Sequence, residues 1–135
     1  MYALRVAGRF TNDEIKEMVT FGRGPTINVT HIVNDGDGSF DPGINSTTLN
    51  ISEDLVNRLE QEEGITADVY LFLTAVTILH ESAHYGDDIK GNPEGDDRED
   101  GFYFEELAYG KRITRMDAWM MVSNYINNLN NNNDK

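Results

Sequence analysis

The pattern of apolar and polar positions is dominated by residues 67–79, which are apolar nearly all round and include no proline, glycine or basic residue. Such a segment is typical of a buried helix. We expect Thr66 to cap the N-terminus of this helix and Gly86 to end it, because these residue types are common at helix ends. Polar residues begin at position 80, so the C-terminal end of a buried helix carries groups that need partners.

Two strands are predicted before this helix. Residues 26–33 are β-branched and alternating, which makes them the clearest strand of the chain, and residues 46–51 predict a second one. The segment 34–43 between them is rich in turn residues and predicts a wide hairpin loop. Residues 2–7 alternate more weakly and also indicate a strand.

Capping patterns predict two helices in the same half of the chain. The T-x-x-E pattern at residues 11–14 is a capping box, and the helix that follows it should end near residues 22–24. Ser52 precedes a second helix, with acidic residues in its first turn, and Gly64 breaks it.

The C-terminal part is predicted to be helical. Residues 87–100 have the composition of a loop, and residues 101–109 form a short helix closed by Gly110. A T-x-x-D cap at residues 114–117 opens the last helix. That helix presents an apolar stripe that we expect to face the core, formed by Trp119, Val122, Ile126 and Leu129.

These elements predict an α+β fold, in which a small antiparallel or mixed sheet packs on the buried helix and the C-terminal part is helical. We expect a single domain over residues 1–129 and a disordered polar tail over residues 130–135.

The net charge and the absence of cysteine limit the classes of ligand and partner that we expect. The 135-residue chain has a net charge of −13 and no cysteine, so any zinc site must use nitrogen and oxygen ligands. Nucleic acid is not an expected partner, because phosphate binding needs a basic face. The longest apolar run is too short to span a bilayer, and the N-terminus lacks the features of a signal peptide. We expect a cytosolic protein, a piece of a larger one, or one exported without a cleaved signal.

The main candidate residues for metal binding and catalysis lie in His80-Glu81-Ser82-Ala83-His84, which reads H-E-x-x-H. On a helix, residues i and i+4 lie on the same face, so the two imidazoles can hold one metal ion. Glu81 lies close enough to the open position of that ion to take a proton from water, which is the zinc-protease arrangement. Zinc in such a site takes three protein ligands, so a third ligand must come from elsewhere in the chain.

Several carboxylates compete for the place of the third ligand. Glu105 and Glu106 lie on a predicted helix that can fold back on the motif helix, and only one of them can point at the metal. The helical wheel does not choose between them. Asp87 or Asp88, just past the motif, is the alternative. Lys90 stands six residues after the second histidine, where another class of zinc protease has its third ligand.

Longer strings around the motif carry a family resemblance. The segments that carry the resemblance are the string HESAHYGDD, the acidic loop after it, and the string DGFYFEELAYG. Through these segments the chain resembles the zincin-like, gluzincin-type metallopeptidase toxin domains of bacterial polymorphic toxin systems. The resemblance implies a zincin-like fold, His80, His84 and Glu105 as zinc ligands, and Glu81 as general base. It also implies a zinc metalloendopeptidase that acts on peptide substrates, is delivered within a larger secreted protein, and has an immunity protein as a candidate partner.

The developing oxyanion needs a donor beyond zinc. Tyr85, Tyr103, Tyr109 and His31 are the candidates, and the sequence does not rank them. By analogy with zincins, the strand at residues 46–51 is expected to offer its edge to an extended substrate.

Other functions fit parts of the same sequence. The motif sets the water chemistry but not the substrate, so a zinc hydrolase of a cell-wall amide or of a small molecule is one alternative. A non-catalytic metal-binding module is a second, although such a module does not require Glu81. An acidic calcium-binding domain built on residues 35–41 and 96–100 is a third, although residues 35–46 fail the EF-hand pattern.

Overall fold

The computed structural model describes residues 1–33, 36–91 and 99–133. The fold is α+β, as predicted, with a small mixed sheet and helices on both sides of its longest helix. In chain order the elements are α1 (Tyr2–Ala7), α2 (Asn12–Met18), β1 (Thr26–Thr30), β2 (Gly38–Phe40), α3 (Pro42–Asn45), β3 (Thr48–Ser52), α4 (Glu53–Gln61), α5 (Gly64–Ile89), α6 (Asp100–Tyr109) and α7 (Arg115–Asn133).

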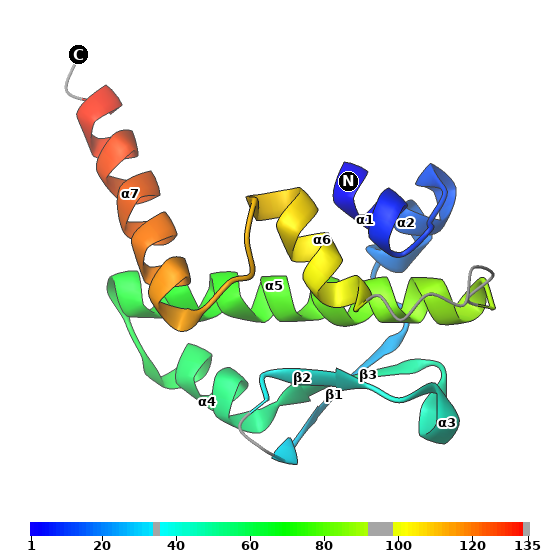
Figure 1. Ribbon diagram of the computed structural model, residues 1–135. Coiled ribbons are helices and arrows are strands. Elements are labelled where there is room, and N and C mark those ends of the chain that lie inside the picture. Colours follow the sequence, from blue (N-terminus) through cyan, green and yellow to red (C-terminus); the bar gives the residue numbers. More distant parts are fainter. Residues whose placement is uncertain (34–35, 92–98, 134–135) are drawn as a thin grey trace.

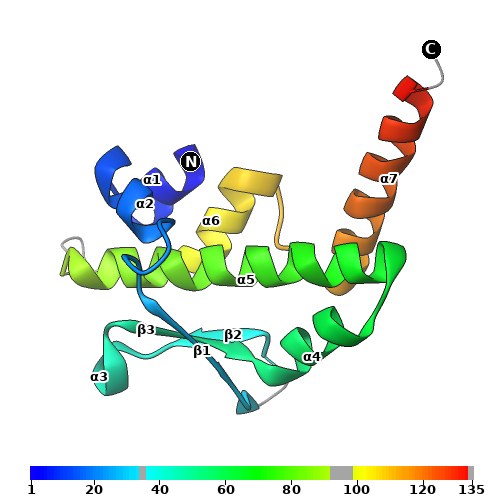
Figure 2. The ribbon, with the colours of Figure 1, turned by 180° about the vertical axis from the view of Figure 1, so that it is seen from behind.

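Helix α5 runs through the middle of the molecule (Figure 1). The sheet and α4 lie on one side of α5, while α1, α2 and α6 lie on the other, and the view from behind shows the same layers (Figure 2). Helix α7 leaves the end of α5 opposite to α1 and α2 and projects from the body. Because α5 separates two layers, it needs apolar residues on both sides, which explains why it has no single apolar stripe.

The sheet has the strand order β1-β3-β2. Strands β1 and β3 are parallel, with Thr26 opposite Thr48, and β2 is antiparallel to β3, with Gly38 opposite Ile51. The predicted hairpin between the first two strands is therefore wrong, because parallel neighbours need a crossover connection. Strand β3 is central and paired on both sides, so the prediction that its edge receives substrate is also wrong. Strand β2 is an edge strand, and it contacts α5.

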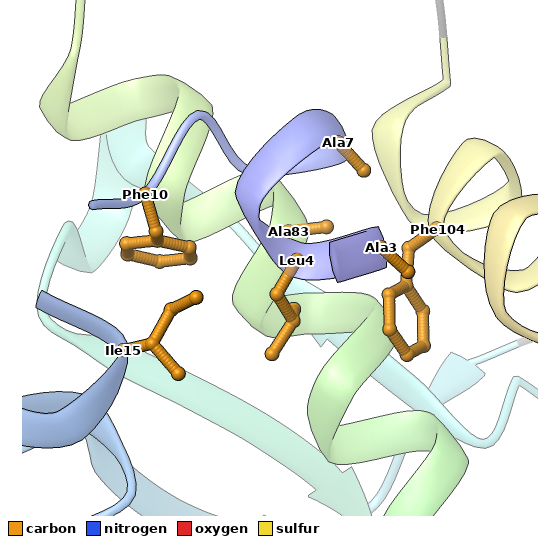
Figure 3. Packing of buried hydrophobic residues seen from close by; sticks show 7 residues of the cluster. All are labelled: Ala3, Leu4, Ala7, Phe10, Ile15, Ala83 and Phe104. Carbon is orange, nitrogen blue, oxygen red and sulfur yellow. The ribbon is translucent and has the colours of Figure 1, made fainter. Parts of the chain in front are cut away.

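Residues 2–7 form helix α1, not the predicted strand. Ala3, Leu4 and Ala7 are buried and pack with Ala83 of α5 and Phe104 of α6 (Figure 3). Their spacing also fits one face of a helix, and six residues do not separate a helical from a strand period. The contacts with α5 and α6 therefore decide the structure of this segment.

The predicted capping box of α2 is confirmed. The Thr11 side chain accepts a hydrogen bond from the Glu14 backbone N–H, and the Glu14 carboxylate accepts one from the Thr11 backbone N–H. The helix ends at Met18, before the glycines expected to end it.

Helix α5 is longer than predicted at both ends. It begins at Gly64, two residues before Thr66, and it passes through Gly86 to Ile89. A Cβ at Gly86 would lie 2.2 Å from the Gly8 carbonyl oxygen and 2.5 Å from the Phe10 ring. Glycine at this position therefore permits close packing of the chain that follows α1; it does not end the helix.

A second apolar cluster lies at the N-terminal half of α5, and its members come from four elements. They are Ile51, Leu55, Val69, Leu73 and Ala118. Ala118 attaches α7 to this cluster, whereas Trp119 and Leu129, both predicted to face the core, are 42% and 44% exposed. Helix α7 is opened by the predicted cap, in which the Thr114 hydroxyl accepts from the Asp117 backbone N–H.

Helix α6 ends at Gly110, which has a φ of 77°, as the sequence predicts. Helix α7 continues to Asn133 and so extends into residues 130–135, which were predicted to form a polar tail. Among the described residues, no helix combines the length and the apolar character that crossing a membrane requires.

Candidate metal centre

Helix α5 presents the two histidines of the motif on one face. The ring centroids of His80 and His84 are 5.3 Å apart, and the two side chains are 15% and 27% exposed. This is the expected result of an i, i+4 spacing on a regular helix. Both side chains are therefore partly desolvated and still accessible to a small ion.

Glu99 faces both histidines. Its Oε1 lies 2.6 Å from Nε2 of His84 and 3.2 Å from Nε2 of His80. One ligand atom from each of these three residues lies within 4.8 Å of the others, so the three side chains form a group that could hold a metal ion. Two imidazoles and one carboxylate are a known ligand set of catalytic zinc.

The start of α6 fixes Glu99. Glu99 is the N-cap residue of α6, and its Oε2 accepts a hydrogen bond from the Phe102 backbone N–H. The same carboxylate thus caps α6 and faces the histidines of α5. A Cβ at Gly101 would lie 2.1 Å from Nε2 of His80, so glycine lets the first turn of α6 lie directly against this imidazole.

Glu105 lies on the other side of the His80 ring. Its Oε1 is 2.6 Å from Nδ1 of His80, and its Oε2 accepts a hydrogen bond from the Ile113 backbone N–H. The neighbouring Glu106 is 53% exposed at its side chain and lies 3.5 Å from Arg112. Of the two glutamates predicted as third ligand, Glu105 contacts Nδ1 of His80, not the Nε2 that lies near Glu99, and Glu106 is exposed to solvent.

The two alternative ligands follow His84 on α5. Asp87 is buried, and its Oδ1 lies 2.6 Å from Nε of Arg9. Asp88 lines the same cleft as the two histidines. Asp87 would have to give up this ion pair with Arg9 in order to bind a metal ion.

Glu81 is buried beside the edge strand. It is 5% exposed, and a Cβ at Gly38 of β2 would lie 2.8 Å from its Oε1. Burial raises the pKa of Glu81 to about 7; the charge of His80 opposes this, and the charges of Glu99 and Glu105 add to it. A carboxyl group with a pKa near neutrality is suited to general acid–base chemistry.

Burial and the neighbouring carboxylates have opposite effects on the pKa of His80. Burial lowers its pKa, but the hydrogen bond to Glu105 and the charges of Glu81 and Glu99 outweigh burial and raise the pKa above its ordinary value. In the absence of a cation, the surrounding carboxylates thus favour a positive charge at this position.

The motif opens into a cleft of about 540 Å³ between β2, the C-terminal half of α5 and the start of α6. The described residues that line it are Gly38, Ser39, Phe40, Pro42, His80, Glu81, His84, Asp87, Asp88, Glu99 and Asp100.

The four predicted oxyanion donors lie outside this described lining. Tyr85 packs against the rings of Phe10 and Phe40, and Tyr103 and Tyr109 pack against the apolar cluster of Figure 3. His31 lines a separate cavity near Glu53.

The buried charge around the motif fits a cation. Glu81, Asp87, Asp100 and Glu105 are all buried, and buried charges are costly unless they are paired. Arg9 pairs with Asp87, while Glu105 pairs with His80. A divalent cation held by His80, His84 and Glu99 would in addition offset the charge of Glu81, which lines the same cleft.

Sequence reasoning did not single out Glu99, because it falls at the end of a segment whose composition predicts only a loop. Glutamate is not a preferred N-cap residue, so local rules place the helix start without assigning this side chain a role. Gly101 was the available signal, since a glycine in the first turn of a helix can mark close approach of a neighbouring group.

The chain was also compared with known proteins. A family model described as metallopeptidase toxin 3 matches residues 1–110. The matched region includes the motif of α5 together with Glu99 and Glu105, and it ends before α7. No curated protein and no solved structure matches the chain.

Proposed function

The chain belongs to the metallopeptidase toxin 3 family, and we propose that it hydrolyses peptide bonds with one zinc ion held by His80, His84 and Glu99. The observation that carries the proposal is that Oε1 of Glu99 lies close to Nε2 of both His80 and His84, in a cleft that all three residues line. This set fits zinc because it offers nitrogen and oxygen ligands from three residues and leaves a position for water or substrate. When bound, zinc supplies a Lewis acid that polarises the scissile carbonyl and makes water nucleophilic near neutral pH.

Glu99 is proposed as third ligand in place of Glu105. Its Oε1 lies on the Nε2 side of both rings, whereas Glu105 is engaged by Nδ1 of His80 and by the Ile113 N–H. A zinc ion would be held by the Nε2 atoms of the two histidines, and both of these atoms lie near the Glu99 carboxylate. Glu99 reaches these atoms from the start of α6.

Glu81 is proposed as the general base. It takes a proton from the attacking water and passes it to the leaving amine. It lines the cleft next to both histidines, and the close packing of Gly38 restricts the position of its carboxylate. In the zinc-free protein burial raises the pKa of Glu81 to about 7, and a carboxyl group in this range suits general acid–base chemistry.

The substrate is proposed to be an extended segment of protein. Strand β2 is an edge strand that borders the cleft, so an extended chain can pair with it next to the motif. We therefore propose β2, and not β3, as the strand that receives the substrate, since β3 is paired on both sides. Delivery within a larger secreted protein and inhibition by an immunity protein remain predictions from the family resemblance.

The proposal is tested by Glu81→Gln, with Glu106→Gln as matched control. Both changes remove one negative charge from a glutamate, but Glu106 is exposed and lies outside the described cleft lining. We expect Glu81→Gln to keep its zinc and to cleave an unstructured protein at least about 100-fold more slowly, and Glu106→Gln to behave as wild type. A Glu81→Gln protein that cleaves at the wild-type rate would exclude this role.

A further inference from the structure

We infer that Glu105 is a positioning residue that fixes which nitrogen of His80 faces the metal, an inference that rests on the proposed function. Its side chain is 6% exposed and touches two groups at once. Oε1 meets Nδ1 of His80, and Oε2 accepts the Ile113 backbone N–H, each at 2.6 Å. The carboxylate thus joins α5 to the segment between α6 and α7.

A neutral imidazole carries its proton on one nitrogen only, and the other nitrogen keeps the lone pair that binds metal. The charged Glu105 accepts hydrogen bonds and donates none, so it favours the His80 tautomer with the proton on Nδ1. The lone pair then lies on Nε2, the nitrogen near the Glu99 oxygen that also contacts Nε2 of His84. Buried hydrogen-bond partners of this kind orient metal-binding histidines and raise their basicity.

Other contacts fix the plane of the same ring. Phe102 meets the His80 ring edge to face, with centroids 5.1 Å apart and planes at 84°. Gly101 lies against the ring at the Nε2 side, where a Cβ would be only 2.1 Å away. These contacts restrict rotation of the ring. The position of the ring proton is then set by Glu105, through its contact with Nδ1.

Glu105→Gln separates this role from a merely structural one. The Ile113 backbone N–H can only donate, so the amide oxygen of the glutamine must face it. The amide NH₂ then faces Nδ1 of His80 and needs an acceptor there. This arrangement drives the His80 proton onto Nε2, where it blocks the metal. The substitution has nearly the same shape and keeps the bond to Ile113, yet it should reverse the tautomer.

The experiment combines two readouts on zinc-free and zinc-loaded protein. Histidine-labelled ¹⁵N spectra at alkaline pH, where the rings are neutral, report the tautomer of His80, with assignments from His31→Gln and His84→Gln variants. Competition with a chromophoric zinc chelator reports zinc affinity. Glu106→Gln is the control for loss of charge, and circular dichroism checks that each variant is folded.

We expect His80 of the wild type to be protonated on Nδ1 and His80 of Glu105→Gln to be protonated on Nε2. Zinc affinity of Glu105→Gln should fall by about 10- to 100-fold, while Glu106→Gln should match wild type. Unchanged affinity in folded Glu105→Gln would overturn the inference. So would a wild-type His80 protonated on Nε2 in the zinc-free protein, a result that needs no folded variant. If the wild type binds no zinc but its His80 carries the proton on Nδ1, the proposed function fails and the Glu105 pairing stands.

Discussion

Gly101→Ala tests how closely α6 must approach the metal centre. An alanine Cβ at this position would lie 2.1 Å from both Nε2 and Cδ2 of His80 and 2.5 Å from Cε1. Ordinary contact begins at 3.4 Å, so the ring and the first turn of α6 must separate by roughly 1.3 Å. The ring cannot turn away freely, because Glu105 and Phe102 hold it. The start of α6 should therefore move, and Glu99 should move with it.

The effect on stability should be small. Alanine in a helix gains about 1 kcal/mol over glycine, and overpacking costs about 1–3 kcal/mol, so a net loss of about 0–2 kcal/mol is expected. The effect on the site should be large, because a displacement of about 1 Å can cost about 100-fold in rate. Zinc affinity by chelator competition, peptidase rate and thermal unfolding together separate the two effects.

Gly110→Ala is the matched control at the other end of α6. Gly110 has a φ of 77° and no neighbouring atom within 4 Å of a built Cβ, so alanine there is strained but does not clash. We expect it to lose about 1–2 kcal/mol of stability and to keep zinc and activity. A Gly101→Ala protein with wild-type zinc affinity and rate would refute the reasoning about the approach of α6.

Two further predictions concern charged groups outside the three proposed ligands. Asp87→Asn should lower the free energy of unfolding by roughly 1–3 kcal/mol, because it removes the negative charge that faces the mostly buried guanidinium of Arg9, but it should keep zinc. Urea titration and zinc affinity check this, and loss of zinc at unchanged stability would instead make Asp87 a ligand. The hydrogen bond from Lys90, followed by those from Thr11, lowers the pKa of Glu14 from 4.5 to about 2. This contribution to stability is complete above about pH 4.5 and is lost as pH falls towards 2, so the acid limb of a urea-stability profile should be shallower in Glu14→Gln, and identical limbs would contradict the assignment.

The parts of the fold that follow from local chemistry could be predicted from the sequence. The capping box at Thr11 and the glycine at 110 are examples, since each is decided by hydrogen bonds or dihedral angles within a few residues. The helical spacing of His80 and His84 is of the same kind. These features need no knowledge of what packs against them.

The features decided by packing could not be predicted in this way. Residues 2–7 are helical because small side chains on one face fit against Ala83 and Phe104. Gly86 lies inside α5 because the backbone at Gly8 approaches it, so a residue type that commonly ends helices has a different purpose here. The parallel pairing of β1 with β3 depends on the path of the chain between them.

The carboxylates around His80 could likewise be predicted only in part, because their contacts with the two ring nitrogens are decided by packing. The sequence predicts that a downstream acid returns to the motif, and α6 does pack on α5. Which acid reaches which nitrogen depends on how the first turn of α6 meets the imidazole, and that contact is set by Gly101 and the cap at Glu99. A helical wheel of α6 contains neither piece of information.

The most direct test of the proposed zinc site is the metal content of protein purified without chelator, for wild type, Glu99→Gln and Glu106→Gln. We expect about one zinc per chain in wild type and in Glu106→Gln, and a large loss of zinc from Glu99→Gln. Wild-type protein that holds no zinc even after zinc is added back, or a Glu99→Gln protein that holds zinc as tightly as wild type, would contradict the proposed site.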